Sequence, residues 1–264
     1  MKFACNRPEI LHILPQPDGA SCGPTCLHAV YRYFDDDIAL QRVIAEVTTL
    51  KDGGTLAVYL ACHALQRGFK ASIISYNLQI FDPTWAMASS REIAEKLSQQ
   101  LPYKKHIPGF EEATNAYLDF LRFGGRLQFK VLTTGLIRSY LKRSIPLLTG
   151  LSATFLYGTA REYVDGNMLV YDDIRGVSTG HFVVLAGYNR LERTVLVADP
   201  LMPNPVSAGQ HYYVNIWRLM CAIMLGTLTY DADLLIVEPR KTRSQQHPQT
   251  YLNRPARMRK KMIH

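Results

Sequence analysis

Residues 16–30 read QPDGASCGPTCLHAV and hold two cysteines, Cys22 and Cys26, about one helical turn apart. Ser21 is a residue type that caps helix N-termini, and the apolar spacing that follows it predicts a helix to about residue 34. Cys22 would lie in the first turn, where the positive end of the helix dipole lowers a thiol pKa. Three interpretations are open: an activated nucleophile, half of a metal site, or a buried helix that contains cysteines.

The size and composition of the chain favour one large domain. It has 264 residues, of which 47% are hydrophobic. Such a chain can bury one sizeable core or two lobes that share one. No apolar run approaches the roughly 18 residues that a membrane span needs. The N-terminal stretch carries charges and no apolar block, so it does not resemble a secretory signal, and we expect a cytoplasmic protein.

The five cysteines do not form a disulfide framework, because their number is odd and their spacing is irregular. Reduced thiols fit a cytoplasmic protein. A zinc site would need two close pairs of ligands, and only Cys22 and Cys26 form a loose pair. We therefore expect no metal and no organic cofactor.

The positive charge of the chain lies at its C-terminal end. Of the 30 basic residues, 8 fall within residues 240–264, which hold no acidic residue, so the other 239 residues are neutral overall. Such a tail is typically a solvated chain end. The alternative is contact with an acidic partner or with nucleic acid.

Helical patterns dominate the first part of the chain, and strand patterns dominate the part after Pro146. The expected helices span about residues 21–34, 38–47, 55–68, 89–101, 110–123, 133–143 and 213–225. The expected strands span about residues 69–76, 127–131, 161–164, 168–171, 181–188, 194–197 and 228–237. Helices packed beside a mainly antiparallel sheet make an α+β fold, without a composition break that would mark two domains.

A cysteine nucleophile needs a histidine base, and the base needs an orienting acceptor. His181 begins an apolar strand, and Asp199 ends the next one, after an intervening turn. Antiparallel pairing brings the start of the first strand beside the end of the second, so Asp199 is expected near His181. It could then hold the imidazole tautomer as a triad acid does.

Gln16 lies six residues before Cys22 and is a natural side-chain donor for an oxyanion hole. The backbone N–H of Cys22 would be the second donor. Together these residues favour catalysis over the other two interpretations of the opening segment.

These motifs resemble the bacteriocin-processing, double-glycine cysteine peptidases and their stand-alone relatives, in the papain-like superfamily. The resemblance rests on Gln16, on Cys22-Gly23, on Gly180-His181-Phe182 and on Ala198-Asp199-Pro200, with a further likeness from Gly53-Gly54-Thr55 to Gly68-Phe69. It covers roughly residues 13–76 and 145–237. Ser21 stands where the family often has an acid, and neither a transporter nor an ATPase segment is present.

The resemblance implies a papain-like fold and assigns the four site residues. Cys22 would be the nucleophile, His181 the base, Asp199 its orienter and Gln16 an oxyanion donor. The implied peptidase domain spans residues 1–239, with a family-specific helical insertion at 77–131, and the basic tail spans 240–264. The inserted helices between about residues 85 and 125 are a candidate for shaping substrate specificity.

The expected activity is hydrolysis of a peptide or amide bond in a peptide or protein substrate, through an acyl-enzyme. Two alternatives stay open: acyl transfer to an amine by the same triad, and a non-catalytic peptide-binding module. Cys26, Cys62 and Cys221 are expected to be structural cysteines of the core, and His12, His28 and His63 to be packing or surface groups. Asp172 and Asp173 are either substrate contacts or, more simply, a solvated loop.

Overall fold

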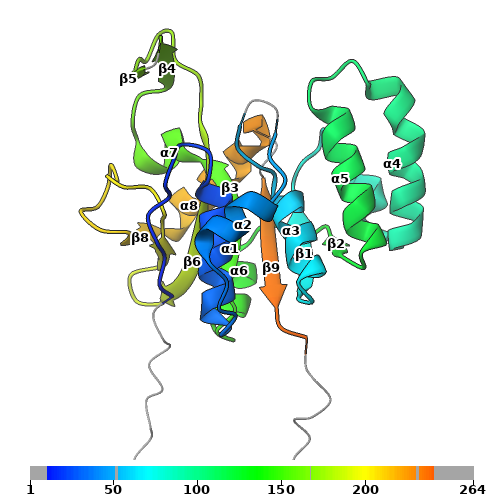
Figure 1. Ribbon diagram of the computed structural model, residues 1–264, viewed down its shortest axis with the longest axis horizontal. Coiled ribbons are helices and arrows are strands. Elements are labelled where there is room, and N and C mark those ends of the chain that lie inside the picture. Colours follow the sequence, from blue (N-terminus) through cyan, green and yellow to red (C-terminus); the bar gives the residue numbers. More distant parts are fainter. Residues whose placement is uncertain (1–10, 51–52, 167, 230–231, 241–264) are drawn as a thin grey trace, which may run out of the picture.

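A computed structural model describes residues 11–50, 53–166, 168–229 and 232–240 of the chain (Figure 1). Of the expected basic tail, only Arg240 falls within these ranges. Cys5 also lies outside them. The expected α+β class is confirmed: helices of the N-terminal part pack on a sheet whose strand pairs are mostly antiparallel.

The central feature is a seven-stranded sheet with the order β2-β1-β9-β3-β6-β7-β8. Only the pair β1–β2 is parallel. The strands are β1 (Lys70–Ser75), β2 (Arg126–Gln128), β3 (Leu147–Ser152), β6 (Gly180–Asn189), β7 (Thr194–Ala198), β8 (His211–Asn215) and β9 (Asp233–Glu238). The last strand that the structure describes, β9, therefore lies in the middle of the sheet, between β1 and β3.

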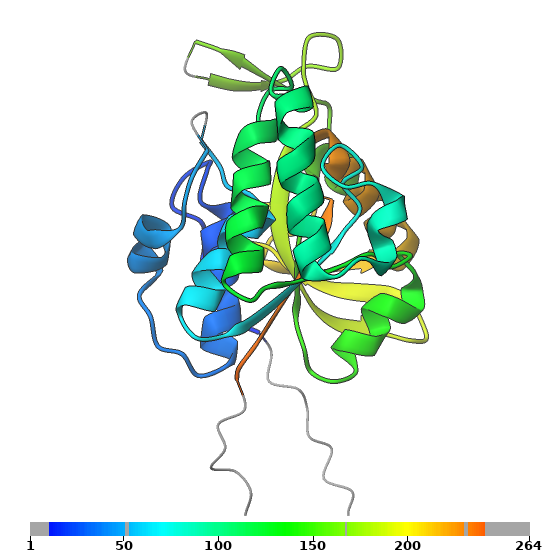
Figure 2. The ribbon, with the colours of Figure 1, turned by 90° about the vertical axis from the view of Figure 1, so that its right-hand side faces the viewer.

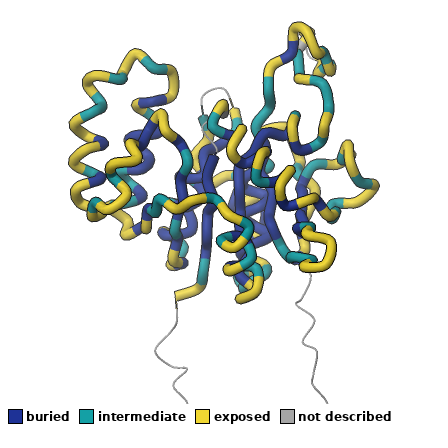
Figure 3. Tube along the Cα trace, turned by 180° about the vertical axis from the view of Figure 1, so that it is seen from behind, coloured by how far each residue is buried: buried dark blue, intermediate teal, exposed yellow. Residues whose placement is uncertain are grey.

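Both faces of the sheet are buried, because apolar side chains follow one another without alternation in its central strands. In β6, Phe182 and Val184 belong to one core cluster, and Val183 and Leu185 belong to the other. Successive side chains of a strand point to opposite faces, so one apolar run supplies both cores. In Figure 3 the buried positions accordingly gather in the strands and in the helices beside them.

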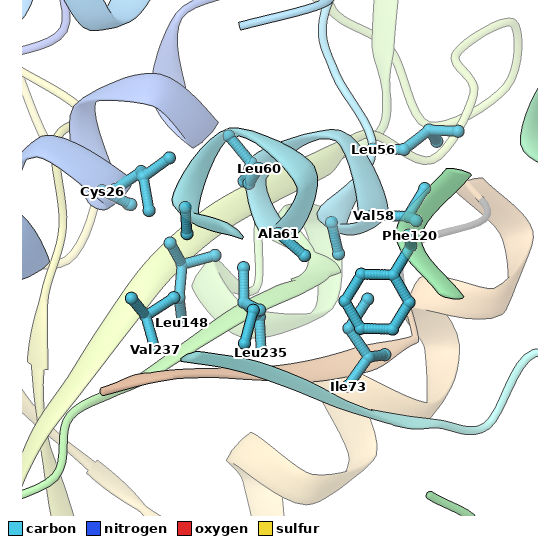
Figure 4. Packing of buried hydrophobic residues seen from close by; sticks show 14 of the residues in the cluster. Cys26, Leu56, Val58, Leu60, Ala61, Ile73, Phe120, Leu148, Leu235 and Val237 are labelled. Carbon is cyan, nitrogen blue, oxygen red and sulfur yellow. The ribbon is translucent and has the colours of Figure 1, made fainter. Parts of the chain in front are cut away.

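The first face is covered by helices from the N-terminal half. They are α1 (Cys22–Tyr33), α2 (Leu40–Glu46), α3 (Ala57–Gln66), α4 (Ser90–Lys104) and α5 (Phe110–Arg122), with the 3-10 turn η1 (Pro83–Met87) before α4. Leu60 and Ala61 of α3 lie over Leu235 and Ile73 in the core (Figure 4). Helices α4 and α5 form a helical hairpin that packs on α3 through α5 (Figure 2).

The second face is covered by α6 (Thr134–Leu141), α7 (Ala153–Tyr157) and α8 (Ile216–Leu225), followed by the 3-10 turn η2 (Gly226–Thr229). Between α7 and β6 along the chain, the strands β4 (Glu162–Asp165) and β5 (Met168–Tyr171) form a separate hairpin. This hairpin projects from the rest of the molecule (Figure 1). It pairs the two strands expected at 161–164 and 168–171, with Asp165 opposite Met168.

Several local signals work as the sequence predicts. Ser89 and Glu92 form a reciprocal capping box at the start of α4. Gly68 ends α3 in a left-handed conformation with φ 88°. Ser21 is a partial exception, because it precedes α1 but its side chain makes no capping hydrogen bond.

Three elements differ from the expectation by several residues at one end. The helix expected at 213–225 is shorter, because its first residues pair with β7 as β8, and Asn215 caps α8 by accepting from the N–H of Trp217 at 2.9 Å. The strand expected at 228–237 begins later, after η2, and the strand expected at 127–131 ends at Gln128. Helix α7 was not expected.

The register of the central strands brings several strand ends together on the side of the sheet where β1 and β3 end. Ser75 pairs with Asp233, and Ser152 pairs with Gly180. The ends of β1 and β3 and the starts of β9 and β6 therefore lie together. We call this the His181 edge, because His181 is the second residue of β6. Figure 1 shows β9 running away from this edge.

Candidate active site

Cys22 is the first residue of α1 and is half-buried. Gly23 allows this helix end to approach its neighbours: a Cβ atom there would lie 2.6 Å from Cγ2 of Thr55 and 3.2 Å from Cδ2 of Phe182. Pro24 is tolerated because the first turn of a helix has unpaired N–H groups in any case. The Cys-Gly-Pro sequence thus seats the thiol against the start of β6.

His181 and Asp199 come together as the hairpin argument predicts. Strand β6 pairs with β7, and Val184 lies opposite Ala198. Nε2 of His181 lies 2.8 Å from Oδ1 of Asp199. Both side chains are buried, and Asp199 is fully so.

The ring of His181 can serve two partners at once. Because Nε2 faces the carboxylate, Nδ1 is left for the thiol of Cys22, and the ring and the thiol each shift the pKa of the other. An imidazole held by a carboxylate on one nitrogen has a defined tautomer, with its other nitrogen free to take a proton. This is the arrangement that a thiol needs in order to become a nucleophile.

The pKa of Cys22 is lowered, and the pKa of His181 is raised. Burial opposes ionisation of Cys22, but the hydrogen bond and the charge of His181 outweigh it, so the pKa of the thiol is lowered. Burial likewise opposes the charge on His181, but hydrogen bonds with Asp199 and Cys22 raise its pKa to about 10. A thiolate–imidazolium pair is therefore favoured near neutral pH.

Asp199 accepts more hydrogen bonds than the sequence indicated. Oδ2 accepts from the hydroxyl of Tyr157 at 2.8 Å and from that of Tyr212 at 2.6 Å, and Oδ1 accepts from the N–H of Leu201 at 2.9 Å. Burial would raise the pKa of this carboxyl group, but the donors, His181 first among them, lower it. Sequence reasoning missed both tyrosines. Tyr212 belongs to the unexpected strand β8, and Tyr157 to the unexpected helix α7.

Gln16 is attached to the same region through its backbone. Its N–H donates to the carbonyl of Pro200 at 2.9 Å, directly after Asp199. Its side-chain Nε2 donates to the carbonyl of Asp18 at 2.8 Å, which uses one of the two amide protons. The strand β8 holds this segment as well, because His211 Nε2 lies 2.8 Å from the carbonyl of Leu11.

The other described cysteines differ from Cys22. Cys26 is buried, its Sγ donates to the carbonyl of Phe182 at 3.2 Å, and burial raises its pKa well above the usual value. Cys62 is half-buried, and its pKa is raised to about 12, mainly by burial. Cys221 was expected in the core, but it is exposed, because it lies on the outer side of α8.

The remaining candidates have structural partners or are exposed. His63 lies 2.8 Å from the hydroxyl of Tyr31 and 3.1 Å from Oε2 of Glu46, inside the helical layer. His28 is also buried, whereas His12 is exposed. Asp172 accepts from the backbone and side chain of Arg175, and Asp173 is exposed. These two aspartates thus lie in an exposed loop that Arg175 helps to hold.

Two apolar cavities lie along α8 and the end of β1. One, of about 300 Å³, is lined by Tyr76, Phe81, Phe129 and Met224 among others. The second, of about 500 Å³, shares Tyr76 and Met224 and includes Cys221. The 3-10 turn η1 and the loops at the two ends of the segment 77–131 line the first cavity, whereas helices α4 and α5 do not.

Within the described ranges, no group of three or more His, Cys, Asp or Glu side chains is arranged to hold a metal ion. Among the same residues, no helix has the length and apolarity needed to cross a membrane.

No protein-family model matches the chain, and no curated protein matches it significantly. Solved structures do match. A putative C39-like peptidase from Bacillus anthracis has 15% identity and a TM-score of 0.43, over 87% of this chain and 95% of that one. The peptidase domain of Streptococcus ComA, a bifunctional ABC transporter of a quorum-sensing pathway, has 12% identity and a TM-score of 0.40, over 87% and 99% of the two chains.

A third structure is a double-glycine-motif protease from an AMS/PCAT transporter in complex with the leader peptide. It has 13% identity and a TM-score of 0.40, over 90% of this chain and 96% of that one. These structures are of the same kind as the family that the motifs resemble. Because the identities are so low, the chemistry of this chain is argued from its own residues.

Proposed function

We propose that the protein is a cysteine peptidase or amidohydrolase that cleaves a peptide or amide bond through Cys22, His181 and Asp199. The observation that supports this most directly is the pairing of a thiol of lowered pKa with a histidine whose other ring nitrogen is held 2.8 Å from a buried carboxylate. A core cysteine would have the opposite properties, as Cys26 does.

The reaction begins with attack of the Cys22 thiolate on the carbonyl carbon of the substrate. The carbonyl oxygen gains negative charge, which the backbone N–H of Cys22 and the second amide proton of Gln16 would stabilise. The C–N bond breaks as the His181 imidazolium protonates the leaving amine. His181 then takes a proton from water, the hydroxide attacks the thioester, and the acid is released as the thiolate is restored.

Acyl transfer is the nearest alternative. An amine in place of water would accept the acyl group from the same thioester, so the triad does not distinguish the two reactions. Product analysis with and without added amines separates them, because an amide product appears only in the second case.

The first test is site-resolved alkylation by iodoacetamide as a function of pH, read by mass spectrometry on the native protein and on His181→Ala. We expect Cys22 to react with an apparent pKa well below the roughly 8.5 of a free thiol. His181→Ala should abolish this advantage. If native Cys22 reacts no faster than Cys62, the proposal is wrong and a non-catalytic peptide-binding module becomes the better interpretation.

A further inference from the structure

The carboxylate of Asp199 is saturated with hydrogen-bond donors. Oδ1 accepts from Nε2 of His181 and from the N–H of Leu201, and Oδ2 accepts from the hydroxyls of Tyr157 and Tyr212. Two donors on each oxygen fill the lone-pair capacity of a carboxylate. The group is fully buried, so no water replaces a donor that is lost.

The two tyrosines reach Oδ2 from different parts of the fold. Tyr157 is the last residue of α7, which follows β3, and Tyr212 lies in β8, opposite Val197 of β7. Burial raises the pKa of each hydroxyl well above its usual value, so both remain protonated and act as donors. Rotation of the carboxylate would break both bonds together, since they end on one oxygen.

We propose that Tyr157 and Tyr212 are positioning residues, which fix Oδ2 of Asp199 and thereby keep Oδ1 on Nε2 of His181. This inference rests on the proposed function, because it assigns the tyrosines a role in maintaining the same site. The two hydroxyls hydrogen-bond to Asp199 and not to the thiol of Cys22 or the imidazole of His181, so they would act on the site only through the carboxylate.

The groups around Asp199 determine in which direction the pKa values of the site change when the tyrosine hydroxyls are removed. These titratable groups are His181 from β6, Tyr157 from α7, Tyr212 from β8, and Cys22 and Cys26 from α1. Without the hydroxyls, Oδ2 becomes a buried acceptor with no donor, which raises the pKa of the carboxyl group and frees it to turn. The imidazolium then loses its acceptor, and the thiolate of Cys22 forms only at higher pH.

The test uses Tyr157→Phe, Tyr212→Phe and the double variant, in the full chain. Phenylalanine keeps the ring and removes only the hydroxyl. Tyr213→Phe is the matched control, because Tyr213 is adjacent to Tyr212 in β8 and is 59% exposed. Urea unfolding of each variant checks that the protein is folded, and the single variants serve if the double variant is not.

The first readout is the pH profile of Cys22 alkylation by iodoacetamide. We expect each single variant to slow alkylation at pH 6 by about tenfold, which is the effect of one hydrogen bond to a charged group. The midpoint should move to higher pH, and further in the double variant, while Tyr213→Phe has no effect. An unchanged midpoint in folded variants, or a midpoint that moves to lower pH, overturns the inference.

The second readout does not depend on a reactive thiol. In a Cys22→Ala background, the ring nitrogens of His181 are titrated by NMR with and without the two tyrosine substitutions. We expect the pKa of His181 to fall by roughly one pH unit when the carboxylate is released. If wild-type Cys22 is unreactive, the proposed function fails while this titration still decides the role of the tyrosines. A His181 pKa that stays constant or rises contradicts it.

Discussion

Oδ1 of Asp199 lies 2.8 Å from Nε2 of His181, across two strands whose chain segments are joined by a turn at residues 190–193. The contact fixes which ring nitrogen faces the thiol of Cys22. It also makes the charge of the imidazolium depend on a carboxylate that is inaccessible to solvent.

Asp199→Asn should therefore weaken the nucleophile without unfolding the protein. The amide group can turn its NH₂ toward the two tyrosine hydroxyls and keep its oxygen on His181, but it has no charge to stabilise an imidazolium. We expect alkylation of Cys22 at pH 7 to fall at least about tenfold, because the pKa of the thiol rises. Asp173→Asn, at an exposed position, is the control. Equal rates in Asp199→Asn and the wild type would show that Asp199 does not support the thiolate.

Gly23→Ala tests how closely the start of α1 must approach its neighbours. The new Cβ would lie 2.6 Å from Cγ2 of Thr55, so the two segments must separate. We expect a loss of about 1–3 kcal/mol in the free energy of unfolding, measured in urea, and slower alkylation of Cys22. Gly19→Ala is the control, because no atom lies within 4 Å of its added Cβ.

A second substitution can reverse this effect. Thr55→Ser removes Cγ2 and keeps the hydroxyl that donates to the carbonyl of Thr48 at 2.8 Å. The variant Gly23→Ala/Thr55→Ser should recover most of the lost stability and reactivity. If it recovers neither, the clash with Thr55 is not the cause.

The sequence anticipated His181 and Asp199 as neighbours because their strands are joined by a short turn, so local pairing brings them together. The position of Cys22 followed from a helix N-terminus, which is also local. The hydrogen bonds from Tyr157 and Tyr212 to Asp199 could not be predicted from local patterns. Tyr212 lies in a strand whose pattern runs on into the apolar helix α8, and only pairing with β7 and the cap at Asn215 separate the two.

Local sequence patterns also do not predict which strands pair when they lie far apart in the chain. The strand pattern of β9 was evident, but its position between β1 and β3 was not. The insertion of β9 brings Asp233 to the His181 edge, opposite Ser75. A buried carboxylate there had no local signal, since an acid at the start of a strand is usually solvated.

Asp233 should make stability depend on pH. Its pKa is raised to about 6, chiefly by burial, although Tyr117 donates to Oδ2 at 2.9 Å. An acid whose pKa is higher in the folded than in the unfolded state binds more protons when folded, so its contribution to stability is present at low pH and falls as pH rises from about 4 to above 6.

Asp233→Asn removes this dependence. Relative to the wild type, the variant should gain roughly 3 kcal/mol in the free energy of unfolding between pH 3.5 and pH 8, as the shift from 3.8 to about 6 implies. Urea unfolding at several pH values measures it. Glu95→Gln, on the exposed side of α4, should show no such trend. A difference between Asp233→Asn and the wild type that is constant with pH would place the ionisation elsewhere.

Gln16→Ala separates oxyanion stabilisation from thiol activation. Iodoacetamide is attacked at a saturated carbon and develops no oxyanion, so alkylation of Cys22 should keep its rate and pH profile. An activated ester such as p-nitrophenyl acetate is attacked at a carbonyl carbon, and its acylation burst should slow by about 10²–10³-fold, the usual effect of losing one oxyanion donor. The backbone bond from residue 16 to the carbonyl of Pro200 is retained in this variant. Gln41→Ala, at an exposed position on α2, is the control. Equal slowing of both reactions would mean that Gln16 supports the position of the thiol instead, and no slowing of either would exclude Gln16 from the site.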